Sequence, residues 1–197
     1  PNNYTITARS MDWKTEIDAN LWIFPKGIKR TGEVGSLSVK WTSKYGSIAT
    51  SAWDIATADG MNEKGLVANV LWLVESEYPK FNPNGTKQGL SISLWAQYVL
   101  DNFATVGEAV NYLKDEPFVL VSDYIPGSDK FTTLHLSISD ARGDNAIFEY
   151  INGKLVGTKE FDGDISNSSG PLWIGGTTES IYFKGIMDEF RIYNYAL

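Results

Sequence analysis

The chain has 197 residues and a hydrophobic content of 43%, which is enough to bury the core of one domain or slightly more than one. Its formal net charge of -7 argues against a nucleic-acid or anionic-membrane partner, because both are bound through clusters of Lys and Arg. No cysteine is present, so these residues hold no disulfide, no thiolate metal site and no thiol nucleophile. No apolar run reaches transmembrane length. Residue 1 is Pro, from which we expect a processed product or a fragment.

The first predicted elements are strands, each marked by alternating or β-branched residues. They cover residues 4–9, 21–27, 36–41 and 47–54. Turn residues follow at 59–60 (Asp-Gly) and at 62–65 (Asn-Glu-Lys-Gly). The apolar run 66–74 then predicts a strand that is buried on both faces.

Two helices are predicted next. Ile92, Trp95 and Val99 share one face at i, i+3 and i+7, which indicates the first helix. Thr105 and Glu108 have the spacing of a capping box and mark the start of the second. The inner face of the second helix is expected to comprise Val106, Ala109, Val110 and Leu113.

Three further strands are predicted at 118–123, 132–140 and 145–153, with the clearest turn at 140–144. Strands, then a helical pair, then strands again favour a layered α+β domain. Neither helix is expected to form a regular βαβ crossover, so a Rossmann-type fold is disfavoured. The only histidine, His135, lies in the strand 132–140 and is expected to be structural, because one His does not make a zinc site of the usual type.

The composition changes after residue 153. From there the sequence contains only strand and turn signals, and glycines separate short apolar pieces. We therefore predict two parts, residues 1–153 and residues 154–197, of which the second is all-β.

Four stretches carry a resemblance to a known family: "ARSMDW" (8–13), "DGMNEKGLVANVLWL" (59–73), "WAQYVLDNFATVGEAV" (95–110) and "HLSISDARGDNAIFEYINGK" (135–154). Together they resemble the choloylglycine hydrolase family over about residues 1–155. That family comprises bile salt hydrolases and penicillin V acylases, which are N-terminal-nucleophile (Ntn) amide hydrolases. The resemblance implies a partial αββα sandwich and a small acyl amide as substrate, with no cofactor and no metal. It is strongest to the Gram-negative branch, some members of which deacylate acyl-homoserine lactones.

The segment 154–197 carries a second resemblance. "NGKLVGTKEF", "ISNSSGPLWIGG" and "YFKGIMDEFRIYNYAL" look like the closing strands of a laminin-G-like jelly roll of the concanavalin A type. The resemblance implies a chimeric chain with a junction near residues 151–157. It also offers an alternative function, a secreted carbohydrate- or matrix-binding module.

The family resemblance assigns catalytic roles to Arg9 and Asp12, which have the family's R-x-x-D spacing. Arg9 would fix the thiolate and the scissile region electrostatically. Asp12 would accept a hydrogen bond from the α-amino group of the nucleophile and align it for proton transfer. The alternative is a surface ion pair at the end of a strand, which is worth little if exposed.

Trp72 and Met11 are assigned to substrate binding. Trp72 stands where bile salt hydrolases carry Asn and penicillin V acylases Tyr, which favours an aromatic or acyl group over a bile salt. A core tryptophan is the alternative. The family's Cys nucleophile is missing from these residues, so the chain as given is expected to be truncated and inactive. A periplasmic or secreted location is expected, and self-association into a homo-oligomer is left open.

Overall fold

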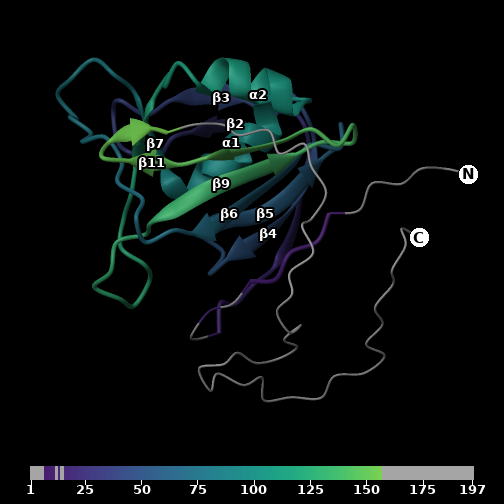
Figure 1. Cartoon of the computed structure of the whole chain (residues 1–197), viewed down its shortest axis with the longest axis horizontal. Helices are drawn as coiled ribbons and strands as arrows, with labels where there is room; N and C mark the ends of the chain where they lie inside the picture. Colours follow the sequence, from purple (N-terminus) through teal and green to yellow (C-terminus); the bar gives the residue numbers. More distant parts are fainter. Residues whose placement is uncertain (1–6, 12, 14–15, 157–197) are drawn as a thin grey trace, which may run out of the picture. The chain divides into compact units, whose positions relative to one another are not determined.

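The main element of the fold is a six-stranded antiparallel sheet in the order β1-β4-β5-β6-β9-β10. The computed structural model describes residues 7–11, 13 and 16–156, all within the first of the two units into which the chain divides, Pro1–Phe161. The strands of the sheet are β1 (Leu21–Phe24), β4 (Ser47–Ala52), β5 (Ala56–Asn62), β6 (Val67–Trp72), β9 (Leu134–Ser139) and β10 (Asn145–Phe148). Figure 1 shows β4, β5, β6 and β9 running side by side.

Two helices lie on one face of this sheet (Figure 1). Helix α1 (Trp95–Asn102) follows a 3-10 turn, η1 (Ile92–Leu94), and packs on β5 and β6, whereas α2 (Val106–Leu113) contacts β10. The core forms between the helices and the sheet residues that point toward them. Its fully buried members include Leu66, Ala68, Trp95, Val99, Leu100, Leu136, Ile138 and Phe148. Such a layer of sheet and helices is a mixed α/β fold, as predicted.

The opposite face of the sheet is exposed along one row of cross-strand neighbours. Ile23 pairs with Ile48, Ile48 with Met61, and Met61 with Val67. The first three are exposed large hydrophobics, and Ile23 is 78% exposed. Among the described residues, the helices therefore cover one face of this sheet only.

Three two-stranded sheets complete the described part. β2 (Lys29–Thr31) pairs with β3 (Lys40–Thr42), and β11 (Tyr150–Ile151) pairs with β12 (Lys154–Leu155), both antiparallel. β7 (Gly89–Ser91) pairs with β8 (Val119–Val121) in parallel, and the two helices connect them. The prediction that no helix would serve in a crossover is therefore wrong for this small sheet. The large sheet is antiparallel throughout, so the fold is still not of the Rossmann type.

Three other local predictions need correction. Of the predicted strand 4–9, the described residues 7–9 form no strand, and Arg9 contacts the sheet through its side chain instead. The Asp59-Gly60 pair lies inside β5 and is no turn. β6 is buried on one face only, since Ala68 and Val70 are buried while their neighbours are partly exposed.

The close contact between β5 and α1 explains why Gly60 is a glycine. A Cβ atom there would lie 2.6 Å from Leu100 Cδ1 and 2.9 Å from the Ile48 carbonyl oxygen. The Gly60→Ala variant is expected to lower the free energy of unfolding by about 1–3 kcal/mol through overpacking. Gly107→Ala is the matched control, because the added Cβ meets nothing within 4 Å. Urea unfolding should give a lower midpoint for the first variant only, and equal midpoints would contradict the contact.

Helix α2 starts where its sequence predicts, at the capping box of Thr105 and Glu108, and it has a second cap. Thr105 Oγ1 accepts a hydrogen bond from the Glu108 amide at 3.2 Å, and Glu108 Oε2 accepts one from the Ala104 amide at 2.8 Å. In addition, Asp140 Oδ2 accepts a hydrogen bond from the Val106 amide at 3.0 Å, although it lies 34 residues away in sequence. A buried carboxylate at a helix N-terminus satisfies an otherwise unpaired amide and interacts favourably with the helix dipole.

This long-range cap predicts a pH-dependent stability. Burial raises the pKa of Asp140, but the amides of Val106 and Arg142 and the Arg142 charge outweigh it and hold the pKa below its usual value. The carboxylate therefore stabilises the fold above pH about 4 and loses this effect as the pH falls through the lowered pKa. Asp140→Asn should cost about 1–2 kcal/mol at pH 7 and less at pH 3, measured by urea unfolding. For Asp144→Asn, at a more exposed carboxylate, the difference in the free energy of unfolding from wild type should not become smaller between pH 7 and pH 3.

Candidate active site

The site is built where β5 and β6 separate. These strands pair from Met61↔Val67 to Asp59↔Asn69, whereas β6 continues to pair with β9 as far as Trp72. The Arg9 side chain lies at this fork. Its Nε donates to Asp59 Oδ1 at 2.5 Å, and its Nη2 donates to Asp59 Oδ2 at 2.7 Å and to the Val70 carbonyl oxygen at 3.3 Å. The guanidinium thus bridges both strands.

This ion pair differs from a loose surface contact. It is bidentate, and the side chains of Arg9 and Asp59 are only 17% and 24% exposed. Two parallel charge-assisted hydrogen bonds fix the plane of the guanidinium, which a single contact does not. Arg9 is therefore a held cation whose orientation is set from β5 and β6.

A β-bulge in β5 directs Asp59 toward Arg9. Thr50 pairs with Asp59 but Ser51 pairs with Thr57, so Ala58 is an extra residue on β5. A bulge changes which side of the strand the following residues face. Thr57 accordingly points to the helices, where its hydroxyl donates to Gln97 Oε1 at 3.0 Å.

The residues behind the bulge form a buried polar network. Gln97 Nε2 donates to Ser47 Oγ at 3.1 Å and to Asp101 Oδ1 at 2.8 Å. Asp101 Oδ2 accepts from Trp41 Nε1 at 2.7 Å and lies 3.0 Å from Arg30 Nε. Burial raises the pKa of Asp101 more than these donors and the Arg30 charge lower it. The network anchors α1, β4 and β5 to one another beneath the site.

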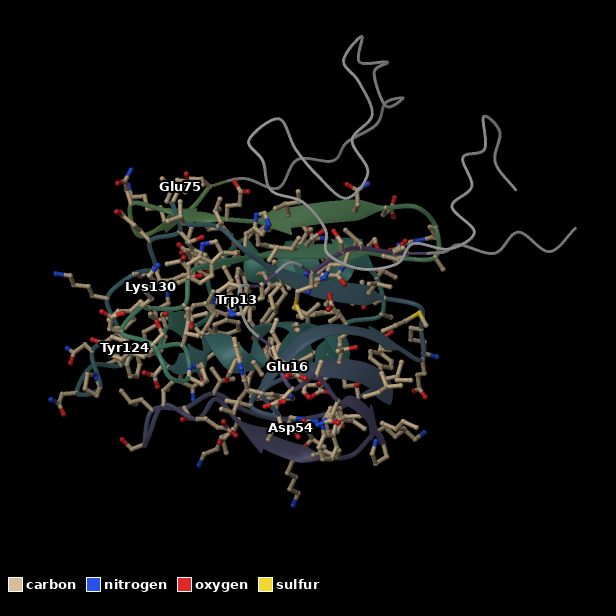
Figure 2. All side chains as sticks on the ribbon, turned by 90° about the horizontal axis from the view of Figure 1, so that it is seen from below. Trp13, Glu16, Asp54, Glu75, Tyr124 and Lys130 are labelled. Atoms are coloured by element: carbon tan, nitrogen blue, oxygen red, sulfur yellow. The ribbon has the colours of Figure 1, made fainter. Side chains whose placement is uncertain are left out.

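Three tryptophans gather at the same end of the sheet as the fork. The Trp13 ring contacts Trp72 edge-on, with centroids 5.4 Å apart, and contacts Trp53 with centroids 6.2 Å apart. Trp72 ends β6, and Trp53 lies in the turn between β4 and β5. We call Trp13, Trp53 and Trp72 the tryptophan cluster. Figure 2 shows Trp13 near the middle of its view.

Arg9, Met11 and Trp72, three of the four site residues predicted from the sequence, lie among the described residues. Arg9 and Met11 are adjacent, because Arg9 Nη2 donates to Met11 Sδ at 3.3 Å. Trp72 is 39% exposed and is therefore no core tryptophan. Asp12 lies outside the described residues. The same holds for residues 4–6 of the first predicted strand and for all but the first three residues of the segment 154–197. His135 Nδ1 lies 3.1 Å from Glu149 Oε1, a contact that a structural role explains.

Asp59 was missed as a site residue. The Asp-Gly sequence is a common turn signal, so the sequence predicts a turn here. It does not indicate that the Asp59 carboxylate binds an arginine 50 residues away. Trp53 was also missed. Its adjacency to Trp13 depends on strand pairing, which no local pattern in the sequence reveals.

No group of three or more His, Cys, Asp or Glu side chains in the described part of the chain could hold a metal ion. Within the same residues, no helix is long and apolar enough to cross a membrane.

Comparison with known proteins adds the family context. Residues 2–168 match the linear amide C–N hydrolases of the choloylglycine hydrolase family. A penicillin V acylase from Pectobacterium atrosepticum is 58% identical over 163 residues, which are 79% of this chain and 43% of that protein. A bile salt hydrolase/transferase from Clostridium perfringens is 33% identical over 153 residues, which are 75% of this chain and 44% of that protein.

Solved structures give the same result. The penicillin V acylase of Agrobacterium tumefaciens superposes with a TM-score of 0.69 at 59% identity, over 77% of this chain and 44% of that one. A conjugated bile acid hydrolase variant from Clostridium perfringens gives 0.62 at 27% identity, over 77% and 46%. The chain thus spans less than half the length of these relatives. With its matched residues and its fold, the chain belongs to the choloylglycine hydrolase family of linear amide C–N hydrolases.

Proposed function

We propose that these residues supply the arginine and the acyl-binding wall of an enzyme that hydrolyses a linear amide of the penicillin V type. One observation carries the proposal: a guanidinium held by two strands lies at the same end of the sheet as the tryptophan cluster. Charge for the scissile amide and apolar surface for the acyl group are thereby combined. The higher identity to penicillin V acylases than to bile acid hydrolases supports an aromatic acyl group.

Arg9 would act as an electrostatic anchor. Its Nε and Nη2 are committed to Asp59 and Val70, and none of the described residues accepts a hydrogen bond from its Nη1. We propose that Nη1 is the donor that faces the reacting groups. A fixed donor aimed at developing negative charge stabilises the transition state without having to reorient during the reaction. Asp59 is the carboxylate that keeps this donor in place.

The reaction itself would follow the chemistry that the family implies. The thiolate of an N-terminal Cys attacks the amide carbonyl, the free α-amino group carries the proton to the leaving amine, and water then hydrolyses the thioester. Asp12 would orient the α-amino group. No cysteine occurs among the 197 residues, so we propose that the chain does not turn over substrate unless a Cys-led strand is supplied upstream of Arg9.

Trp72 and Met11 would bind the acyl group. Met11 touches the guanidinium through its sulfur, and Trp72 presents an indole beside Trp13. A phenoxyacetyl or long acyl chain laid on these side chains would bring its carbonyl toward Arg9. The polarizable thioether and the indole faces suit an aromatic ring better than a polyhydroxylated steroid.

The test compares the chain as given with a version that carries a Cys-led strand before residue 1, against penicillin V and long-chain acyl-homoserine lactones. We expect hydrolysis by the extended version and none by the chain as given. Fluorescence quenching of the tryptophans should report saturable binding of penicillin V by both. Turnover by the chain as given would refute the requirement for the added nucleophile, and absence of binding by both would refute the acyl-binding wall.

Two further expectations belong to the same proposal. We propose a periplasmic or extracellular location for the protein, and a boundary near residue 153 between the hydrolase part and a laminin-G-like piece. Limited proteolysis should then yield a stable fragment that ends near Gly153 to Gly157.

A further inference from the structure

The turn that joins β4 to β5 has an unusual conformation. The Ile55 amide donates to the Ala52 carbonyl oxygen at 3.0 Å, and the two central residues, Trp53 and Asp54, have φ of 51° and 52°. Two consecutive positive φ angles are typical of tight hairpin turns that use Asn-Gly. A bulky tryptophan in this region of φ is an outlier. Such conformations persist only where the surroundings impose them, and they cluster at functional sites.

Asp54 supplies one set of these constraints. Its Oδ1 accepts hydrogen bonds from Ser51 Oγ at 2.6 Å and from Trp22 Nε1 at 3.0 Å. Its Oδ2 accepts one from Asn20 Nδ2 at 2.8 Å. Donors from β4, from β1 and from the segment before β1 therefore converge on a single carboxylate. The hydrogen bonds from Ser51 and Trp22, and then that from Asn20, outweigh burial and lower the pKa of Asp54. It is ionised at neutral pH. Figure 2 shows Asp54 in the lower part of the molecule.

Trp53 is fixed on the other side of the turn. Its backbone amide donates to the Ile17 carbonyl oxygen at 3.0 Å, and its ring meets Trp13 at an interplanar angle of 79°. Trp13 in turn contacts Trp72. Trp53 is thus the member of the tryptophan cluster that comes from the strained turn, and its place depends on the backbone conformation of that turn.

We propose that Asp54 is a positioning residue that holds this turn so that Trp53 completes the aromatic wall for the acyl group. The use of the wall for an acyl group rests on the proposed function; the control of Trp53 by Asp54 does not. Asp54 touches no reacting group and acts through Trp53. The wall would select an acyl group with a planar aromatic ring, because edge-on indoles offer apolar faces to such a ring.

The first experiment needs no ligand. Closely spaced indoles give a coupled near-UV circular dichroism signal, so Trp53→Phe should remove the part that arises from Trp13 and Trp53. Asp54→Gly permits positive φ without strain but removes the carboxylate. If the carboxylate positions Trp53, this variant should lose the same part of the signal. If backbone freedom alone is required, it should keep the wild-type spectrum, and the proposal fails.

Controls separate positioning from general damage. Asp129→Gly removes an exposed carboxylate elsewhere and should leave the signal unchanged. Asp54→Asn favours positive φ and keeps an oxygen for Ser51 and Trp22, so it should retain most of the signal. Far-UV circular dichroism verifies folding. If Asp54→Gly does not fold, Ser51→Ala is the substitute, because it removes the donor of the shortest hydrogen bond to Asp54. This variant should lower the same signal. A folded Ser51→Ala variant with the full signal would overturn the proposal.

The second experiment measures binding of penicillin V to the 197-residue chain by tryptophan quenching. We expect Asp54→Gly to bind about tenfold more weakly than wild type and Asp54→Asn to bind within about threefold of it. Equal affinity of wild type and Asp54→Gly would refute the role of Asp54 in the acyl site. Absence of saturable binding by wild type would refute the proposed acyl function, and the ligand-free spectra would still decide whether Asp54 positions Trp53.

Discussion

Replacing Arg9 with lysine is expected to lower turnover of penicillin V by at least about 100-fold in a chain that carries the Cys-led strand. Removing one preorganised donor from a developing oxyanion typically has an effect of this size. Lysine keeps the positive charge but has no planar fork, so it does not reach both Asp59 oxygens and the Val70 carbonyl at once. The measurement is kcat and KM of the chain with the Cys-led strand, with Arg9 and with Arg9→Lys, under identical conditions. A fall mainly in kcat is expected, because Arg9 is proposed to act on the transition state.

The matched control is Arg142→Lys, at an arginine whose side chain is 63% exposed. It should leave turnover unchanged. Asp59→Asn should reproduce most of the Arg9→Lys effect, because it frees the guanidinium from its bidentate partner. If Arg9→Lys retains turnover within a few-fold, the guanidinium is a structural clamp between β5 and β6, and the proposed catalytic role is wrong.

The second large effect is expected from Asn62→Asp, which should lower the free energy of unfolding by about 3 kcal/mol or more. Asn62 is buried at the end of β5. Its Nδ2 donates to the carbonyl oxygens of Leu100 at 2.8 Å and Phe103 at 2.7 Å, at the end of α1. Its Oδ1 accepts hydrogen bonds from the amides of Lys64 and Leu66. An aspartate would direct a carboxylate oxygen at two carbonyl oxygens in the core.

The control for this variant is Asn111→Asp on the exposed side of α2, where the side chain accepts a hydrogen bond from Lys114 Nζ. Urea unfolding at pH 7 should show a large fall in midpoint for the first variant and almost none for the second. Because a buried carboxyl without ion-pair partners favours its neutral form, the Asn62→Asp variant should recover part of its stability at acidic pH. Equal stability of both variants would show that the end of α1 does not depend on Asn62.

The strands and the helix start that were predicted correctly depend on residues that are close to one another in the sequence. The strands at 21–27 and 47–54, the capping box at Thr105 and Glu108, and the turn before Leu66 all correspond to observed elements. The predictions that failed depended on distant partners. Asp59-Gly60 has turn chemistry, but Gly60 is required because Leu100 of α1 lies against β5. The parallel pairing of β7 with β8 likewise follows from packing around the helices.

Only part of the candidate site could be predicted from the sequence, for the same reason. Arg9 is found from the motif that it shares with the family, but its carboxylate partner among the described residues is Asp59, on a different strand. The bulge at Ala58 that aims Asp59 has no distinctive residue of its own. The tryptophan cluster joins residues 13, 53 and 72, which approach one another only once β4, β5 and β6 are paired.

The pairing of β6 with β9 has a consequence for the order of folding. β4, β5 and β6 are joined by short turns, whereas residues 73–133, including both helices, separate β6 from β9. Closing so long a loop carries an entropic penalty that the local hairpins avoid, and contacts of large sequence separation slow folding. The hairpins β4–β5 and β5–β6 can therefore form early, and with them the fork and the turn at Trp53. The large sheet is completed only when β9 docks on β6, so docking of β9 would be the slow step in assembling the sheet.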